Sequence, residues 1–149
     1  MSFPPFQSPR LLADIGGTYA RFSLEMAPGE FVHTRSLKCA EHADFHAAVT
    51  AYLSGLSHLT LPPIKNAAVA IANPVAGDSV RMTNYHWQFS IEAMRERLQF
   101  DHLVVVNDFT ALAMALPSLL PTQRRQVGGG TPVARSVVAL IGAGSGLGV

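Results

Sequence analysis

With 149 residues, 48% of them hydrophobic and 14% charged, the chain is long enough to bury a sizeable core, and this composition favours a globular fold over a disordered chain. The net charge of +1 gives no reason to expect nucleic acid or a membrane surface as a partner, and no apolar run approaches membrane-spanning length. The single cysteine, Cys39, excludes an internal disulfide and favours a reducing cytoplasm, and we expect it to be an inert, partly buried thiol.

The first part of the sequence predicts an antiparallel meander. Residues 1–10 are expected to form a loose N-terminus. Short apolar or alternating runs predict strands over residues 11–15, 20–26 and 30–37. The pairs Gly16-Gly17 and Pro28-Gly29 supply turns between these strands, so the three strands should pair in sequence order.

Helices and strands alternate in the rest of the sequence. Asp44 and Ser90 are the residue types that cap the N-terminus of a helix. Helices are expected over residues 45–56, 91–98 and 109–116, and strands over residues 67–72, 87–89, 102–106 and 136–141, with a hairpin-like excursion between residues 73 and 82 and a polar junction at 123–130. This order predicts an α/β fold whose mixed sheet joins the meander to parallel βαβ units.

A candidate phosphate site follows the first predicted strand, in the sequence Ala13-Asp14-Ile15-Gly16-Gly17-Thr18. Glycine has no Cβ, so this turn can take a positive φ and let an anion approach its backbone N–H groups. Thr18 adds a hydroxyl donor, and Asp14 is placed to hold a phosphate-bound Mg²⁺ through water. The alternative is a tight hairpin turn without a ligand.

The pair Asn107-Asp108 lies where a buried strand meets a helix. Asp108 is either a helix cap or a general base that accepts a hydroxyl proton during phosphoryl transfer. Asn107 carries both a donor and an acceptor and could orient a sugar hydroxyl. Because ligands collect at the carboxyl ends of strands in α/β sheets, we expect this pair to lie near the first glycine turn.

A second glycine-rich segment, residues 142–148, follows the last predicted strand and resembles another phosphate loop. Leu147 stands where the dinucleotide fingerprint needs its third glycine, and the chain has no Gly-Lys-Ser/Thr, so a Rossmann or Walker A site is disfavoured. The alternative is a flexible hairpin tip. The six histidines are scattered, without the spacing of metal ligands.

The segments at residues 13–18, 82–84, 107–111 and 142–148, in this order, resemble the bacterial glucokinases, which are ATP-dependent sugar kinases with an actin-like, ribonuclease-H-like fold. The resemblance extends from about Leu11 to Val149. It departs from the family at Tyr19, where asparagine is usual, and at Ser145, where threonine is usual. The cysteine-rich zinc motif of a related sugar-kinase and repressor group is absent from the sequence.

The resemblance implies Mg²⁺-dependent transfer of phosphate from ATP to the 6-hydroxyl of D-glucose. It implies that Asp108 is the base and that Asn107 and Asp108 bind the sugar. The residues that it implies around the nucleotide phosphates are Ala13, Asp14, Ile15, Gly16, Gly17, Thr18, Gly142, Gly144, Ser145 and Gly146. Two alternatives stay open: a non-catalytic sugar- or nucleotide-sensing module on the same fold, and an actin-like filament or chaperone ATPase.

The resemblance also implies a domain organisation. Residues 11–118 correspond to the small lobe, and residues 119–149 to a junction, an opening strand and the phosphate loop of an incomplete large lobe. We therefore expect little or no kinase activity from the 149-residue chain alone. We also expect the strand at 136–141 to pair with another chain, as a homodimer or through the incomplete lobe, because an unpaired apolar edge promotes association.

Overall fold

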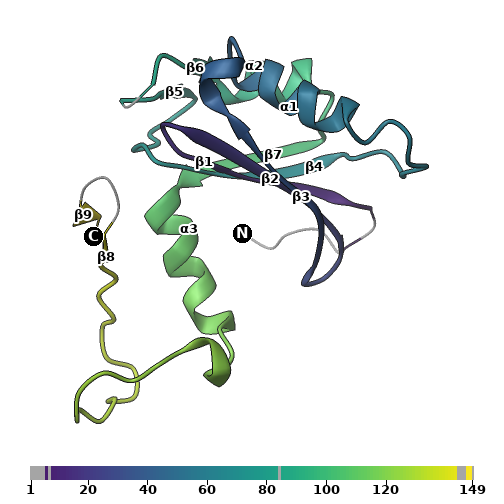
Figure 1. The fold of residues 1–149 in the computed structure, drawn as a ribbon. Helices are drawn as coiled ribbons and strands as arrows, with labels where there is room; N and C mark the ends of the chain where they lie inside the picture. Colours follow the sequence, from purple (N-terminus) through teal and green to yellow (C-terminus); the bar gives the residue numbers. More distant parts are fainter. Residues whose placement is uncertain (1–5, 7, 84, 144–146, 149) are drawn as a thin grey trace. The chain divides into compact units, whose positions relative to one another are not determined.

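The computed structural model describes residue 6 and residues 8–83, 85–143 and 147–148. The chain divides into two compact units, residues 1–108 and residues 109–149, each of which is described by itself (Figure 1). The boundary expected at residue 118, between a small lobe and the start of a large lobe, stays a prediction.

The first unit is built on a five-stranded mixed sheet with the order β3-β2-β1-β4-β7. Its strands are β1 (Arg10–Ile15), β2 (Tyr19–Ala27), β3 (Glu30–Lys38), β4 (Asn66–Ile71) and β7 (His102–Asn107). The first three strands pair antiparallel, whereas β4 and β7 run parallel to β1. The predicted α/β fold with a meander and parallel units is confirmed.

Two helices, α1 (Phe45–Ser54) and α2 (Ile91–Arg97), cover one face of this sheet (Figure 1). They share a face because the crossovers from β3 to β4 and from β4 to β7 move across the sheet in the same direction, and such crossovers are right-handed. Both predicted caps form: Asp44 Oδ1 accepts from the Ala47 N–H at 2.7 Å, and Ser90 Oγ accepts from the Ala93 N–H at 3.0 Å.

The core lies between these helices and the sheet. Alternate strand residues such as Leu11, Ile15 and Val69 are fully buried, because successive side chains of a strand point to opposite faces. The ring of Phe22 on β2 stacks on that of Tyr52 on α1, with centroids 5.2 Å apart. The predicted excursion forms a small hairpin of β5 (Ser79–Arg81) and β6 (Gln88–Ser90), one residue later than the expected strand at 87–89.

The second unit has little regular structure. Helix α3 begins at Asp108, the last residue of the first unit, and ends at Ala115; the short strands β8 (Gly142–Ala143) and β9 (Leu147–Gly148) form a hairpin. The strand predicted at residues 136–141 is wrong: this run is irregular, and Val137 is 97% exposed. A strand needs a neighbour for its backbone hydrogen bonds, and the described residues provide none for this run.

Among the described residues, no helix has the length and apolar character needed to cross a membrane.

Candidate active site

The carboxyl ends of β1, β4 and β7 meet at one edge of the sheet. Ile15 on β1 pairs with Ile71 on β4, and Ile71 pairs with Asn107 on β7. Neighbouring strands lie about 4.8 Å apart, so Ile15 and Asn107 are about 10 Å apart across the sheet. Gly16 follows Ile15 directly, and Asp108 follows Asn107. The structure therefore brings the first glycine turn and the Asn107-Asp108 pair to the same edge.

The glycine turn between β1 and β2 is fixed by four hydrogen bonds. The Gly16 N–H donates to the Tyr19 carbonyl at 2.9 Å, and the Ala72 N–H, just after β4, donates to the Ile15 carbonyl at 2.9 Å. Cys39 supplies the other two: its N–H donates to the Thr18 carbonyl at 2.9 Å, and its thiol donates to the Gly16 carbonyl at 3.4 Å. The turn is thus anchored by the segment after β4 and by the segment after β3.

Gly16 is not needed for the fold of this turn. Its φ lies outside the left-handed region, so the positive φ that the sequence allows is not used at this position. A Cβ added there would lie 3.5 Å from the Tyr19 carbonyl oxygen, an ordinary contact. Neither backbone conformation nor packing therefore requires glycine at position 16. A residue without a side chain there leaves room for a ligand to approach the turn.

Asp14 precedes the turn and points away from the helix-covered face of the sheet. Its carboxylate pairs with Arg21, its cross-strand neighbour on β2, at 2.9 Å, and the two side chains are 53% and 62% exposed. No cluster of three or more His, Cys, Asp or Glu suited to a metal ion occurs in the described part of the chain. A cation beside Asp14 would therefore take its other ligands from water and from a bound phosphate.

The Asp108 carboxylate is held by its neighbour. Asn107 Nδ2 donates to Asp108 Oδ1 at 2.9 Å and to the Asn73 carbonyl at 3.3 Å. The Asn107 amide group thus links the end of β7 to the loop after β4. As the first residue of α3, Asp108 also lies where the helix dipole favours a negative charge.

Asn73 contributes to this site although its sequence context does not predict it. This side chain is only 7% exposed, its Oδ1 accepts from the Thr83 N–H at 3.0 Å, and its Nδ2 donates to the Pro74 carbonyl at 2.9 Å. Asn73 therefore joins the end of β4, the segment before β6 and, through its carbonyl, Asn107. The signal in the sequence is an Asn-Pro pair directly after the strand predicted at residues 67–72, and such a pair by itself indicates only a turn.

The second predicted phosphate segment belongs to the second unit. Gly142 lies in the β8–β9 hairpin, and a Cβ there would come within 2.7 Å of the Phe109 ring, which would then have to shift. Gly144, Ser145 and Gly146 lie outside the described residues.

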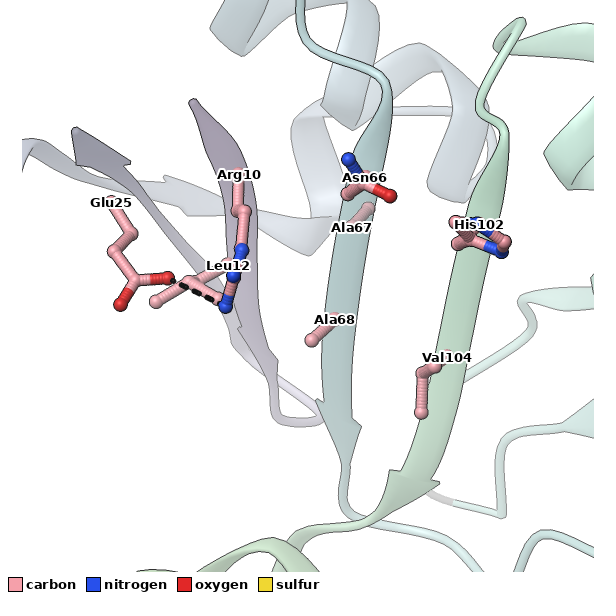
Figure 2. A pocket seen from close by; sticks show the side chains of 8 residues that line it. All are labelled: Arg10, Leu12, Glu25, Asn66, Ala67, Ala68, His102 and Val104. Carbon is pink, nitrogen blue, oxygen red and sulfur yellow. Dashed lines mark ion pairs between the residues drawn. The ribbon is translucent and has the colours of Figure 1, made fainter. Parts of the chain in front are cut away.

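A hollow in the first unit lies away from the predicted site. It has a volume of about 220 Å³, and the residues that line it include Arg10 and Glu25, which form an ion pair at 3.5 Å (Figure 2). Its polar rim includes Asn66 and His102, which, like Arg10, are the first residues of their strands. The hollow therefore lies at the amino ends of the parallel strands, opposite the glycine turn and Asp108.

Comparison with known proteins shows the family of this chain. The family model described as glucokinase matches residues 11–149. The chain belongs to the glucokinase family. It is 56% identical over 141 residues to the "Bifunctional protein glk" of Burkholderia pseudomallei, covering 95% of this chain and 22% of that protein. It is 51% identical over 142 residues to the glucokinase of Ralstonia nicotianae, covering 95% of this chain and 42% of that protein.

Solved glucokinases have the same fold. A glucokinase from an Antarctic psychrotroph matches with a TM-score of 0.74 and 34% identity, over 88% of this chain and 42% of that one. A ROK family glucokinase from Streptomyces griseus, solved in complex with glucose and AMPPNP, matches in fold with a TM-score of 0.56 and 21% identity, over 70% of this chain and 35% of that one. The chain thus spans less than half the length of the glucokinases that it matches.

Proposed function

We propose that this chain is the amino-terminal part of an ATP-dependent glucokinase that acts in the cytoplasm, and that the complete enzyme transfers the γ-phosphoryl group of ATP to the 6-hydroxyl of D-glucose. The observation that carries the proposal is the meeting of an anchored, bare-backbone glycine turn and a fixed carboxylate at one sheet edge, about 10 Å apart by strand spacing. Membership of the glucokinase family supports it.

In this proposal Asp108 is the general base. As the 6-hydroxyl oxygen attacks the γ-phosphorus, its proton passes to the Asp108 carboxylate, and the bond from the γ-phosphorus to the bridging oxygen breaks to release ADP. A positioned base contributes about 10²–10⁴-fold in rate. The hydrogen bond from Asn107 holds the carboxylate in one orientation, and Asn107 and Asp108 together bind the sugar.

The turn at residues 13–18 and the segment at residues 142–146 hold the phosphates of ATP in this proposal. Backbone N–H groups of the first turn donate to phosphate oxygens, and the Thr18 hydroxyl adds a donor. The exposed Asp14 carboxylate fits Mg²⁺, which proteins bind through one or two carboxylates, water and substrate phosphates. When bound, the metal neutralises phosphate charge, and Asp14 would hold it through water.

A chimeric enzyme tests the proposal. Residues 1–149 are joined to the part of the Ralstonia nicotianae glucokinase that follows its matched region, and glucose-dependent ADP release is measured in a coupled assay. Asp108→Asn should lower kcat by about 10²–10⁴-fold while the glucose affinity, measured by calorimetry, changes little. Asp101→Asn, which alters an exposed carboxylate just before β7, is the matched control and should leave kcat unchanged.

Three other outcomes of this experiment would contradict the proposal. A chimera that binds glucose and ATP without turnover would indicate the sensing module instead. ATP hydrolysis without any need for sugar would indicate the filament or chaperone ATPase. An Asp108→Asn chimera with normal kcat would show that Asp108 is not the base.

We also propose that the 149-residue chain alone is inactive and associates through its exposed apolar residues. In the second unit the exposed apolar residues that are more than 60% exposed are Met114, Leu120, Val127, Val133, Val137, Val138 and Ile141. Exposed apolar residues at this density favour association. Sedimentation velocity should show a dimer or larger species at high concentration, and a clean monomer there would contradict this part.

A further inference from the structure

Cys39 occupies a position beneath the glycine turn that its sequence context does not predict. It is the first residue of a short 3₁₀ turn, Cys39–Glu41, which follows β3. Its side chain is 0% exposed, so it is fully buried, not partly buried as expected from the sequence. Both of its hydrogen-bond donors, the backbone N–H and the thiol, are directed at carbonyls of residues 16–18.

The thiol remains a donor throughout the neutral range. Burial raises the pKa of the Cys39 thiol, and this effect exceeds that of its backbone hydrogen bond, which lowers the pKa. A protonated thiol can donate to the Gly16 carbonyl, whereas a thiolate would repel it. The 3.4 Å distance between Sγ and the Gly16 oxygen is suited to a hydrogen bond from sulfur.

The orientation of one peptide group follows from this contact. The described chain has no cis peptide bond, and in a trans peptide the C=O and the following N–H point in opposite directions. Because the Gly16 carbonyl points inward to the buried Cys39 thiol, the Gly17 N–H points outward, away from the core. The hydrogen bond from the Cys39 N–H fixes the Thr18 carbonyl of the turn as well.

We propose that Cys39 is a positioning residue for the nucleotide: by holding the Gly16 carbonyl, it directs the Gly17 N–H toward the place where a phosphate of ATP binds. This inference rests on the proposed function of the turn. It assigns to a residue outside the glycine motif part of the preorganisation that anion binding by backbone groups requires. Loss of the thiol should therefore weaken the binding of ATP and leave the binding of glucose unchanged.

Kinetics of the chimera test the inference with three variants. Cys39→Ala removes the donor and should raise the KM for ATP about three- to tenfold, with unchanged kcat at saturating ATP and unchanged KM for glucose. Cys39→Ser keeps a donor and should give a KM for ATP closer to that of the unmodified chimera. Val49→Ala is the control, because Val49 is an equally buried residue on α1 outside the hydrogen bonds that anchor the turn.

Three results would overturn the inference: an unchanged KM for ATP in Cys39→Ala, an equal rise in Val49→Ala, or a serine variant as impaired as the alanine variant. If Cys39 contributed only to packing, the KM for ATP would rise similarly in the alanine and serine variants and in Val49→Ala. The comparison of Cys39→Ser with Cys39→Ala therefore separates positioning from packing.

A second measurement does not depend on kinase activity. In the 149-residue chain, amide hydrogen exchange is followed by NMR at Gly16 and Cys39, whose N–H groups close the turn. Cys39→Ala should speed exchange at both amides by about tenfold or more while Val69, in β4, keeps its rate. Unchanged exchange would overturn the inference even if the chimera is active. Faster exchange combined with an inactive chimera would refute the proposed function and leave the anchoring role of Cys39 supported.

Discussion

The two glycine-rich segments of this chain have similar composition and very different surroundings. The first follows a central strand of a five-stranded sheet and is anchored by hydrogen bonds from Cys39 and Ala72. The second lies in a two-stranded hairpin, and the run before it exposes Val137 and Val138. The difference shows that glycine content predicts a turn, whereas the hydrogen bonds that anchor the first turn come from neighbouring segments that glycine content does not identify.

The largest expected effect concerns the core that only the first unit possesses. Phe22→Ala removes a buried ring that stacks on Tyr52, and should lower the free energy of unfolding by about 3–5 kcal/mol. Val137→Ala changes a side chain that is 97% exposed and should alter it by less than about 0.5 kcal/mol. Urea unfolding of the 149-residue chain measures both values. A large cost for Val137→Ala would mean that the second unit has a core of its own.

The architecture was predictable because its signals are local and strong. The apolar runs of β1, β4 and β7, the caps Asp44 and Ser90, and the glycine and proline turns each specify one conformation without distant contacts. Their order then leaves few topologies for an α/β sheet. The shared position of Gly16 and Asp108 at one edge follows from that topology.

The errors share a different cause, which is dependence on distant partners. The apolar run at 136–141 has the composition of a strand, but strand formation needs a paired neighbour, and none is described for it. Cys39 and Asn73 acquire their contacts from segments 23 and 34 residues away in sequence, Gly16 and Asn107 respectively. Spacing along the chain contains no signal for such contacts.

The core of the first unit should also make the stability of the chain depend on pH. Burial raises the pKa of Tyr52 to about 12, the nearby Arg35 charge opposing this more weakly, and the hydroxyl donates to the His33 carbonyl at 3.0 Å. A pKa raised above the unfolded value of 10 means that the stabilisation is complete below pH 10 and is lost as pH rises through 12.

The urea concentration at the unfolding midpoint should therefore be lower at pH 11.5 than at pH 9. The difference between the two pH values should be much smaller for Tyr52→Phe. Tyr19→Phe is the control, because Tyr19 is 42% exposed. Equal pH profiles for the unmodified chain and Tyr52→Phe would contradict the prediction.

A smaller effect is expected from the helix caps. Asp44→Ala removes the acceptor of the Ala47 N–H at the start of α1 and should cost about 1 kcal/mol. The ion pair with Arg97 at 3.6 Å adds little, since both partners are substantially exposed. Ser136→Ala removes a hydrogen bond to Val133 in the exposed second unit and should leave the unfolding free energy unchanged. Thermal unfolding measures the stability of both variants. An equal loss of stability in Asp44→Ala and Ser136→Ala would contradict the view that the first unit carries the stability of the chain.

The smallest expected effect on stability is also the most informative about function. Gly16→Ala should leave the free energy of unfolding unchanged or raise it by up to about 1 kcal/mol, because the site accepts a Cβ and alanine restricts the unfolded chain. In the chimera the same variant should raise the KM for ATP by about tenfold or more, because a methyl group would stand between the backbone and an approaching phosphate. Gly142→Ala should instead disturb the β8–β9 hairpin, where the Cβ meets the Phe109 ring. If Gly16→Ala were strongly destabilising, glycine would be required there by the fold. The turn would then give no reason to infer a phosphate site.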